Sequence, residues 1–417
     1  MKSNQIVNLK ALINYKSIPA KKYSLLDDAF SKQDLIEGIK VILSKKITMS
    51  QITEKFEKNF AKSVGSKYAV MVNSGSSANL LAVFAACNPL RKNRFKPGDE
   101  AIIPSVLWST SLWPLVQAGL KPVFVDIDPL TLNADIELLI SKITSRTKLI
   151  MAIHVLGNST DIEILKKVCE MKKIILVEDT CESLGSKFKN KSLGTFGDFG
   201  TYSFYYSHQI TSGEGGMVTC NTLDDYKILY SLRAHGWARG INAIRSKKKI
   251  GNLNKDFVFI NSGFNLRPTD IAAAIAFNQF KRLQKLMNIR DYNRTKIINK
   301  LLNSNNWKQQ FTFIKPAPNI SPSWFGLPIL ISERLINYKK KFLKYLNQKG
   351  VETRPIISGN FVNQPCVKLY KLNQNNEKFL NAQLVDDRGF FIGLHTQKIK
   401  NYQLEYLEKH LLNIENL

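Results

Sequence analysis

Apolar and polar positions along this chain alternate between two spacings. From about residue 66, short runs of β-branched and other apolar residues are separated by stretches that carry apolar residues at helical spacing. The runs predict strands over 68–72, 101–103, 122–125, 149–153, 174–177, 202–206 and 216–219. Two of the stretches predict helices over 79–86 and 162–171. Strands that alternate with helices are typical of an α/β domain with a mostly parallel mixed sheet flanked by helices.

The last third of the chain has a different pattern. A long helical stretch begins at Arg267, has Pro268 near its first turn and continues past Leu286. After about residue 320 the chain is richer in lysine and poorer in strands, and the predicted elements are a strand over 325–331, a helix over 334–348 and a strand over 351–353. We therefore predict an N-terminal segment and a large domain over 1–285, followed by a smaller α+β domain over 286–417.

Composition places the chain among ordinary globular proteins. Of its 417 residues, 44% are hydrophobic and 22% are charged, which argues against wholesale disorder. No apolar run reaches 18 residues, so no membrane-spanning helix is predicted. The first 24 residues scatter Lys and Asn through the region where a signal peptide needs an apolar stretch. We expect a cytoplasmic protein.

The net charge of +27 comes from 60 Lys+Arg against 33 Asp+Glu. An excess of this size can indicate nucleic acid or an anionic membrane as partner. The basic residues are spread over the whole chain, so we interpret the charge as surface composition and expect neither partner. The five cysteines are widely spaced, form no local metal or redox motif and are expected to be reduced, buried thiols: Cys87, Cys169, Cys181, Cys220 and Cys366.

Two strand ends carry residues suited to a cofactor. Asn73-Ser-Gly-Ser-Ser-Ala78 follows a predicted strand and opens a helix, where free backbone N–H groups and the helix dipole favour a phosphate. An ordinary capped turn has the same appearance. Asp179 follows a buried strand, where a protonated heterocyclic nitrogen would offset its desolvation. The alternative is that Asp179 caps the next helix.

A third segment completes a set of motifs that occur together in one protein family. Residues 203–216 read SFYYSHQITSGEGG. Together with Gly75-Ser-Ser-Ala78, Trp108 after Ile103-Pro104, Glu178-Asp179-Thr-Cys-Glu182 and Gly263-Phe-Asn-Leu-Arg267, this segment resembles the sugar aminotransferase-like DegT/DnrJ/EryC1/StrS superfamily. The resemblance covers roughly residues 25–400. It implies the fold type I architecture of pyridoxal-phosphate-dependent transferases.

One position departs from the aminotransferase pattern. His208 stands where those enzymes carry the lysine that forms a Schiff base with the cofactor, and no lysine occurs between Lys191 and Lys227. Imidazole cannot form that stable imine. The resemblance therefore implies that pyridoxal 5′-phosphate or pyridoxamine 5′-phosphate is bound without a covalent bond. His208 would act as a general base, with an ordinary pKa suited to neutral pH.

The same exchange of lysine for histidine marks the nucleotide-sugar 3-dehydratases of the superfamily. One branch holds an iron–sulfur cluster on closely spaced cysteines after the histidine. This chain has only Cys220 between His208 and Gly263, which favours the branch without a cluster. Trp324-Phe-Gly326 and Glu352-Thr-Arg-Pro355 also resemble that branch. Gln209 replaces a second histidine that we expect there.

The resemblance implies a role for each matching residue. Gly75, Ser76 and Ser203 would hold the cofactor phosphate, Asn265 would reach it from the partner subunit of a homodimer, Trp108 would stack on the ring, Asp179 would pair with the ring nitrogen, and Glu182 would lie near the ring hydroxyl. A core position is the alternative for Trp108. Arg354 would bind the nucleotide diphosphate, unless it forms a surface ion pair.

The implied reaction removes the C-3 hydroxyl of a nucleotide-linked 4-keto-6-deoxyhexose, with GDP-4-keto-6-deoxymannose as the best guess. L-Glutamate regenerates the amine form of the cofactor, ammonia is released, and the product is a 4-keto-3,6-dideoxy sugar for surface polysaccharides such as lipopolysaccharide O-antigen. Three alternatives remain: the iron–sulfur-dependent dehydratase of a CDP-linked sugar, a non-catalytic regulator that binds the cofactor, and an ordinary aminotransferase. The nucleotide and the sugar stereochemistry do not follow from the sequence.

Overall fold

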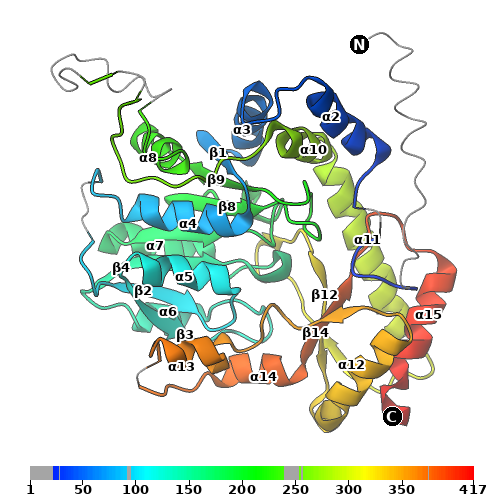
Figure 1. Ribbon diagram of the computed structural model, residues 1–417. Coiled ribbons are helices and arrows are strands. Elements are labelled where there is room, and N and C mark those ends of the chain that lie inside the picture. The colour runs from blue at the N-terminus through cyan, green and yellow to red at the C-terminus, as the bar shows by residue number, and fades with distance from the viewer. Residues whose placement is uncertain (1–21, 28, 92–94, 239–252, 255–256, 374) are drawn as a thin grey trace.

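The computed structural model describes residues 22–417 except 28, 92–94, 239–252, 255–256 and 374. Its centre is a seven-stranded sheet in the order β1-β9-β8-β5-β4-β2-β3 (Figure 1). The strands are β1 (Tyr68–Val72), β2 (Glu100–Pro104), β3 (Lys121–Val125), β4 (Thr147–Ile153), β5 (Ile175–Asp179), β8 (Phe199–Ser203) and β9 (Gly216–Cys220). Strands β3, β2, β4, β5 and β8 pair in parallel, while β9 is antiparallel to both β8 and β1. The predicted α/β class with a mostly parallel mixed sheet is confirmed.

Helices and loops cover both faces of this sheet. Alternate residues of one strand lie in different hydrophobic clusters, as Ile102 and Ile103 of β2 do, because successive side chains of a strand point to opposite faces. The helices of this part are α4 (Gly75–Ala86), α5 (Ser109–Gln117), α6 (Ile136–Ser141), α7 (Ile162–Lys172) and α8 (Leu223–Arg233). Helices α2 (Lys32–Leu43), α3 (Gln51–Val64) and α10 (Asp270–Phe280) lie together beyond the β1 edge.

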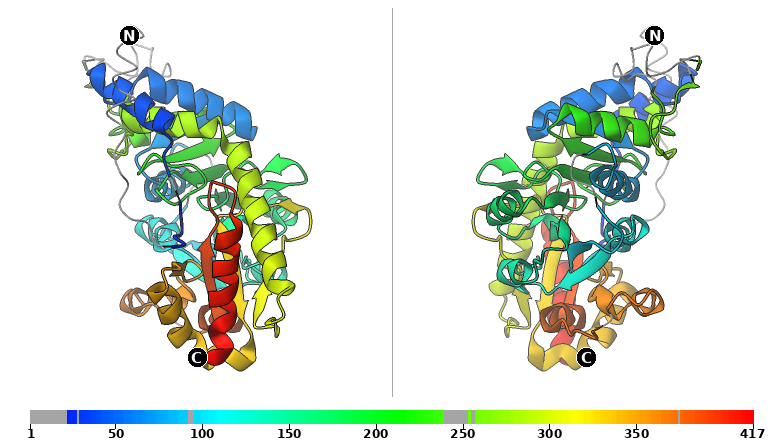
Figure 2. Two further views of the ribbon diagram at one scale, coloured as in Figure 1. Left: turned by 90° about the vertical axis from the view of Figure 1, so that its right-hand side faces the viewer. Right: turned by 90° about the vertical axis from the view of Figure 1, so that its left-hand side faces the viewer.

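The C-terminal part has a sheet of its own, in the order β10-β12-β14-β13. Its strands are antiparallel: β10 (Phe311–Phe313), β12 (Gly326–Ile331), β13 (Thr353–Arg354) and β14 (Gly389–Gly393). Its helices are α12 (Lys339–Gln348), α13 (Pro365–Leu369), α14 (Leu380–Arg388) and α15 (Asn401–Leu411). Helix α11 (Leu283–Leu302) runs from the large sheet towards this part and lies beside α15 (Figure 2).

Short elements complete the described chain. Strands β6 (Lys187–Phe188), β7 (Lys191–Ser192) and β11 (Ile320–Ser321) form a third sheet, and the 3-10 turns are η1 (Val155–Gly157), η3 (Glu333–Tyr338), η4 (Phe361–Asn363) and η5 (Leu412–Asn416). Among the described residues, none of the helices combines the length and the apolar character needed to cross a membrane.

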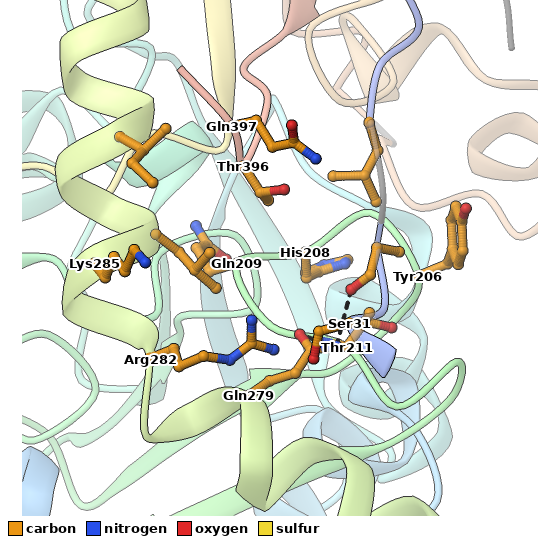
Figure 3. Close-up of a pocket in the computed structure, with 14 residues that line it drawn as sticks. Ser31, Tyr206, His208, Gln209, Thr211, Gln279, Arg282, Lys285, Thr396 and Gln397 are labelled. Atoms are coloured by element: carbon orange, nitrogen blue, oxygen red, sulfur yellow. Dashed lines mark hydrogen bonds between the residues drawn. The ribbon is translucent and has the colours of Figure 1, made fainter. Parts of the chain in front are cut away.

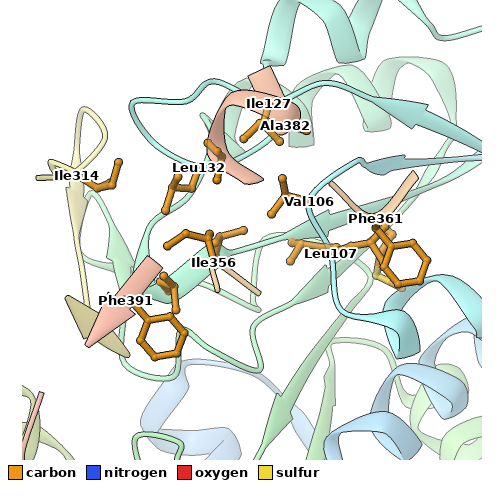
Figure 4. Close-up of a cluster of buried hydrophobic side chains, with 14 of the residues drawn as sticks. Val106, Leu107, Ile127, Leu132, Ile314, Ile356, Phe361, Ala382 and Phe391 are labelled. Atoms are coloured by element: carbon orange, nitrogen blue, oxygen red, sulfur yellow. The ribbon is translucent and has the colours of Figure 1, made fainter. Parts of the chain in front are cut away.

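The apolar core continues from the large sheet into the C-terminal part. Val106 and Leu107, which follow β2, belong to one buried cluster with Ile356, Phe361 and Phe391 (Figure 4). The cluster fixes the loop after β2 against the C-terminal sheet. The rim of the large sheet, where Asp179 and Ser203 end their strands, is therefore held by packing from both parts of the chain.

Several predicted elements have different bounds in the structure. The long helix predicted from Arg267 past Leu286 is two helices, because α10 ends at Phe280 and α11 begins at Leu283. The strand predicted over 202–206 is shifted, since β8 ends at Ser203. Helix α4 begins at Gly75, four residues before the predicted start. The helix predicted over 334–348 is η3 followed by α12, and the strand over 351–353 is β13, one to two residues later.

Candidate active site

The carboxyl ends of the central strands bring three of the predicted residues to one edge of the large sheet. Asp179 is the last residue of β5 and Ser203 is the last residue of β8, and these two strands are parallel neighbours. Gly75 is the first residue of α4, which follows β1. Ligands of open α/β sheets bind at this edge, so the order of the strands assembles the site.

The start of α4 forms a close-packed turn that only glycine allows. A Cβ atom on Gly75 would lie 2.5 Å from Ser203 Cβ, and one on Gly216 would lie 2.3 Å from the carbonyl oxygen of Ser74. Ser74 caps the helix by accepting a hydrogen bond from the Ser77 amide. The amides of Gly75 and Ser76 precede the first intrahelical hydrogen bond, so they are donors for an anion.

Trp108 stands at the edge of the same turn. It is the N-cap residue of α5 and its side chain is 57% exposed, so the alternative of a core tryptophan is wrong. Ser76 Oγ donates to Thr110 Oγ1 at 3.1 Å and joins the first turns of α4 and α5. The indole face is therefore available to a planar ligand beside the anion site.

Asp179 is a buried carboxylate held by three donors. Its Oδ2 accepts from Asn79 Nδ2 and Ser111 Oγ, each at 2.7 Å, and its Oδ1 accepts from the Cys181 amide at 3.1 Å. No helix begins in the turns after Asp179, so the helix-cap alternative is wrong. Thr201 Oγ1 donates to Asn79 Oδ1 at 2.6 Å and orients the amide towards the carboxylate.

Asn79 and Ser111 were not predicted as site residues. Asn79 lies one turn into α4 after the glycine, and that spacing on a helix places it on the same face as Gly75. This spacing was a usable signal for Asn79. Ser111 offers no comparable signal, because its partner lies 68 residues away in the sequence.

Glu182 lies beside Asp179 and accepts a hydrogen bond from the backbone of a strained turn. The amide of Leu156 donates to Glu182 Oε2 at 3.1 Å, and Leu156 has φ of 52°, a conformation that non-glycine residues rarely adopt. Burial, and to a smaller extent the charge of Asp179, raise the pKa of Glu182 to about 7. The carboxyl group is therefore partly protonated near neutral pH and is able to donate as well as to accept.

His208 lines a cavity of about 170 Å³ between the loop after β8 and the start of α11 (Figure 3). Its ring packs edge-on against Phe325 at 5.1 Å and Tyr205 at 5.9 Å. Nδ1 is shielded from solvent and has no partner among the described residues, which leaves Nε2 as the accessible ring nitrogen. Burial and the charge of Arg290 lower the pKa of His208 to about 3. The expectation of a pKa near neutrality is therefore wrong, and the imidazole is neutral at pH 7.

Gln209 ties this loop to its neighbours. Its Nε2 donates to the carbonyl oxygens of Glu182 and Ser323, and its side chain is buried. The residue that replaces the expected second histidine thus holds the His208 loop to the segment after β5. Gln209 Oε1 has no partner among the residues that the structure describes.

Asn265 and Arg354 lie outside this group of contacts. Asn265 is exposed and its Oδ1 accepts from Arg267 at 3.0 Å. Arg354 is exposed and donates to Glu352 Oε1 at 3.2 Å, which is the surface ion pair that the sequence left open. Within the described ranges no group of three His, Cys, Asp or Glu side chains could hold a metal ion.

The residues present fit a phosphorylated, protonatable aromatic ring. The glycine-lined turn offers amide donors to a phosphate, the exposed face of Trp108 offers a stacking surface, and the buried Asp179 offers a counter-charge to a ring nitrogen. Pyridoxal phosphate has all three features.

Comparisons with known proteins place the chain in a family. The family model described as the DegT/DnrJ/EryC1/StrS aminotransferase family matches residues 30–406. The chain is 38% identical over 387 residues to GDP-4-keto-6-deoxy-D-mannose 3-dehydratase of Yersinia pseudotuberculosis, covering 91% of this chain and 96% of that one.

Two solved structures of the same type of enzyme superpose on most of the chain. The Escherichia coli GDP-4-keto-6-deoxy-D-mannose 3-dehydratase with bound hydrated PLP has a TM-score of 0.85 at 35% identity and covers 94% of this chain and 100% of that one. A GDP-4-keto-6-deoxymannose 3-dehydratase with a trapped PLP–glutamate geminal diamine has a TM-score of 0.84 at 36% identity, with 93% and 100% covered.

Fold and site together define an enzyme with the fold type I architecture of pyridoxal-phosphate-dependent transferases. Within that class, the chain belongs to the DegT/DnrJ/EryC1/StrS aminotransferase family.

Proposed function

We propose that this protein is a pyridoxal-phosphate-dependent nucleotide-sugar 3-dehydratase. Its substrate is a 4-keto-6-deoxyhexose linked to a nucleoside diphosphate, with GDP-4-keto-6-deoxymannose favoured because relatives that match over nine-tenths of the chain act on it. The observation that carries the proposal is His208 in the place of the lysine, in a chain that brings Gly75 and Asp179 to one edge of the sheet.

The overall reaction balances with glutamate as the reductant. The C-3 hydroxyl of the sugar is replaced by hydrogen, and the oxygen atom that the sugar loses equals the one gained when glutamate becomes 2-oxoglutarate and ammonia. Glutamate therefore supplies the two electrons, and no separate reductase is required. The trapped glutamate adduct of a relative supports glutamate as the amino donor.

The residues that we assign to the cofactor follow from the geometry above. The amides and hydroxyls of Gly75, Ser76 and Ser203 hold its phosphate, and Trp108 stacks on its ring. Asp179 pairs with the ring nitrogen, which makes the ring an electron sink when the cofactor is bound. These assignments are supported by one cluster of contacts at the edge of the sheet.

Glu182 completes this set. With its pKa raised to about 7, its carboxyl group is able to donate a hydrogen bond to the ring hydroxyl in its protonated form.

His208 moves the proton. In the neutral imidazole, Nε2 is the nitrogen that is able to accept a proton from the bound reactants, while Nδ1 is shielded from solvent. Once protonated, an imidazole whose pKa is lowered to about 3 is a strong acid. It therefore gives the proton up readily to the departing C-3 hydroxyl. One residue serves as base and then as acid, and the proton it delivers is the one it has just accepted.

A homodimer with shared sites completes the proposal. Asn265 is exposed, and its neighbour Leu266 accepts a hydrogen bond from the Asn73 amide at the end of β1. Phe257 and Phe259 of the same region are also exposed, at 62% and 58%. Exposed aromatic residues of this size are typical of interfaces, and this supports our assignment of Asn265 to the partner's cofactor phosphate.

We also propose that Arg354 leaves its pair with Glu352 to bind the nucleotide diphosphate. An exposed surface ion pair contributes little to stability, so breaking it to bind a diphosphate costs little free energy. The division into a large domain over 1–285 and a small domain over 286–417, and the location in the cytoplasm, are further parts of the proposal.

The experiment that tests the function offers the protein its cofactor and glutamate with a panel of GDP-, CDP- and dTDP-linked 4-keto-6-deoxyhexoses. We expect ammonia and 2-oxoglutarate to form in equal amounts with the GDP-linked sugar, and only when glutamate is present. Release with a CDP-linked sugar alone would overturn the nucleotide assignment. No ammonia with any member would overturn the dehydratase.

A further inference from the structure

Arg290 is a buried cation with little to bind. It lies on α11, is 2% exposed, and donates from Nη2 to the carbonyl oxygen of His208 at 3.3 Å. Its Nε and Nη1 have no hydrogen-bond partner among the described residues. Buried arginines are normally paired, because an unsatisfied charged donor away from water is costly. A cation kept in this position calls for a reason other than stability.

The surroundings of the His208 ring disfavour its charged form. The neutral base carries its proton on Nδ1, where no acceptor lies, and the ring packs edge-on against the apolar ring of Phe325. Protonation at Nε2 would therefore put a full charge on a ring in apolar surroundings. Arg290 adds a positive charge at the backbone carbonyl of His208. A charged imidazole would therefore be both poorly solvated and repelled by Arg290.

The other charged and titratable groups around the loop do not offset this. Asp27 lies in the segment before α2, and its two carboxylate oxygens accept hydrogen bonds from the backbone amides of Thr396 and Gln397. Arg282 and Lys285 line the opposite wall of the cavity (Figure 3), and Arg282 is paired with Asp34 at 2.6 Å. The groups that remain are Tyr205 and Tyr206 on the same loop and Glu182, which lies behind Gln209.

The pKa shifts of His208 and Arg290 agree with this geometry. Burial is the first cause of the lowered pKa of His208 and Arg290 is the second. Burial lowers the pKa of Arg290 itself to about 10, while Asp27 acts in the opposite direction. Arg290 therefore remains a cation at neutral pH.

We propose that Arg290 is a positioning residue that anchors the backbone of His208 and keeps its imidazole neutral until the reacting proton arrives. The inference rests on the proposed function, because only a proton carrier needs this protection. Without it, solvent would protonate His208 at a higher pH, and the base would be lost over a wider pH range.

The test uses three single substitutions. Arg290→Met removes the charge and keeps the bulk, Arg290→Lys keeps the charge, and Arg294→Met is the matched control. Arg294 lies one turn further along α11, where its guanidinium lies over Trp324 at 4.4 Å and donates to the Ile314 carbonyl. Arg290→Gln is a second neutral variant that retains a donor for the His208 carbonyl, should the methionine variant fail to fold.

The first measurement is a histidine NMR titration of the cofactor-free protein from pH 5 to 8. The His208 signal is identified by its absence in His208→Asn. We expect it not to titrate in the unsubstituted protein, in Arg290→Lys or in Arg294→Met. In the neutral Arg290 variants its midpoint should rise by more than about two pH units, into the titrated range. A signal that stays untitrated in Arg290→Met and Arg290→Gln overturns the proposal.

The second measurement is the pH dependence of the reaction with glutamate, followed by the absorbance of the bound cofactor. Loss of rate at low pH should begin at a higher pH in the neutral variants, while Arg294→Met keeps the original profile. An unchanged pH profile in Arg290→Gln overturns the claim that Arg290 keeps His208 neutral during the reaction. The two proposals fail separately, because the titration needs neither substrate nor turnover. A shifted midpoint in a protein without dehydratase activity would contradict only the proposed function.

Discussion

At the scale of single residues, the site is a set of groups whose ionisation is set by burial. The Asp179 carboxylate accepts hydrogen bonds from three donors. The Glu182 carboxyl group accepts from one donor and lies near the carboxylate of Asp179. His208 has an unpaired Nδ1, and the cation Arg290 donates to its backbone carbonyl. Burial disfavours the charged forms of Glu182 and His208. The same rim therefore holds a carboxylate ready for a cation, an acid near its pKa and a neutral base.

The histidine at position 208, which replaces the lysine of aminotransferases, offers the most informative substitution. In His208→Lys the introduced lysine should form a covalent bond to the cofactor, yellow in colour and made permanent by borohydride, because the rest of the cofactor site is intact. Dehydration should fall by more than about 100-fold, since the covalent bond competes with the free amine form. Absorbance after borohydride treatment and dialysis measures the bond. A variant with no such bond and full dehydration would mean that residue 208 does not face the cofactor.

Glu182 provides a pH-dependent prediction for the cofactor-free protein. Its pKa is about 7 when folded against an ordinary 4.5, so the folded state binds more protons between these values. Stability must then fall as pH rises through that window. Glu182→Gln should be more stable than the unsubstituted protein by roughly 1–3 kcal/mol at pH 8, with no difference near pH 4.5. Urea unfolding at both values measures this.

Glu163→Gln is the matched control. Glu163 is exposed, and its hydrogen bond with Lys189 lowers its pKa, so its replacement should give no gain at pH 8. An equal gain in both variants would show that overall charge, not the environment of Glu182, is the cause.

The sequence predicted those site residues whose signal is local. Gly75, Asp179 and His208 stand in short motifs, and the structure places Gly75 at the start of α4 and Asp179 at the end of β5. The role of His208 at the cofactor stays a prediction. Ser111 and Arg290 could not be predicted. Their partners lie 68 and 82 residues away, and a serine or an arginine at helical spacing indicates only which side of a helix it occupies.

At the scale of elements, the errors in strand and helix bounds have physical causes. Phe204, Tyr205 and Tyr206 favour strands by residue type, yet β8 ends at Ser203 and the two tyrosines are about half exposed. The break between α10 and α11 at Arg282 leaves the apolar spacing nearly unchanged, so periodicity cannot detect it. Elements were predictable from patterns, but their ends depend on contacts with distant segments.

The contact between the β8–β9 loop and the start of α4 gives a prediction at this scale. Gly216→Ala should lower cofactor affinity by at least about 10-fold, because its Cβ would push the Ser74 carbonyl away and distort the anion site. Fluorescence titration with pyridoxal phosphate measures the affinity.

Gly213→Ala is the control from the same loop. Gly213 has φ of 83° and nothing within 4 Å of its Cβ position, so alanine there costs about 1 kcal/mol of stability without crowding the site. Equal losses of affinity in the two variants would contradict the role given to Gly216.

At the scale of the whole molecule, the claim is that two copies share their sites. His208 serves its own subunit in our proposal, while Asn265 serves the partner. His208→Asn and Asn265→Ala should each lose most of the activity. When the two variants are co-expressed, half of the dimers are mixed and each mixed dimer has one intact site, so activity should recover to about a quarter. No recovery would place both residues in the same subunit's site.

The central claim is that this rim removes an oxygen atom and does not transfer an amine. The direct measurement is the mass of the nucleotide sugar formed from GDP-4-keto-6-deoxymannose with glutamate and cofactor. We predict a product lighter than the substrate by one oxygen atom, because the C-3 hydroxyl is replaced by hydrogen. A product that keeps this oxygen and carries an amino group in place of the 4-keto oxygen would be that of an aminotransferase and would contradict the account.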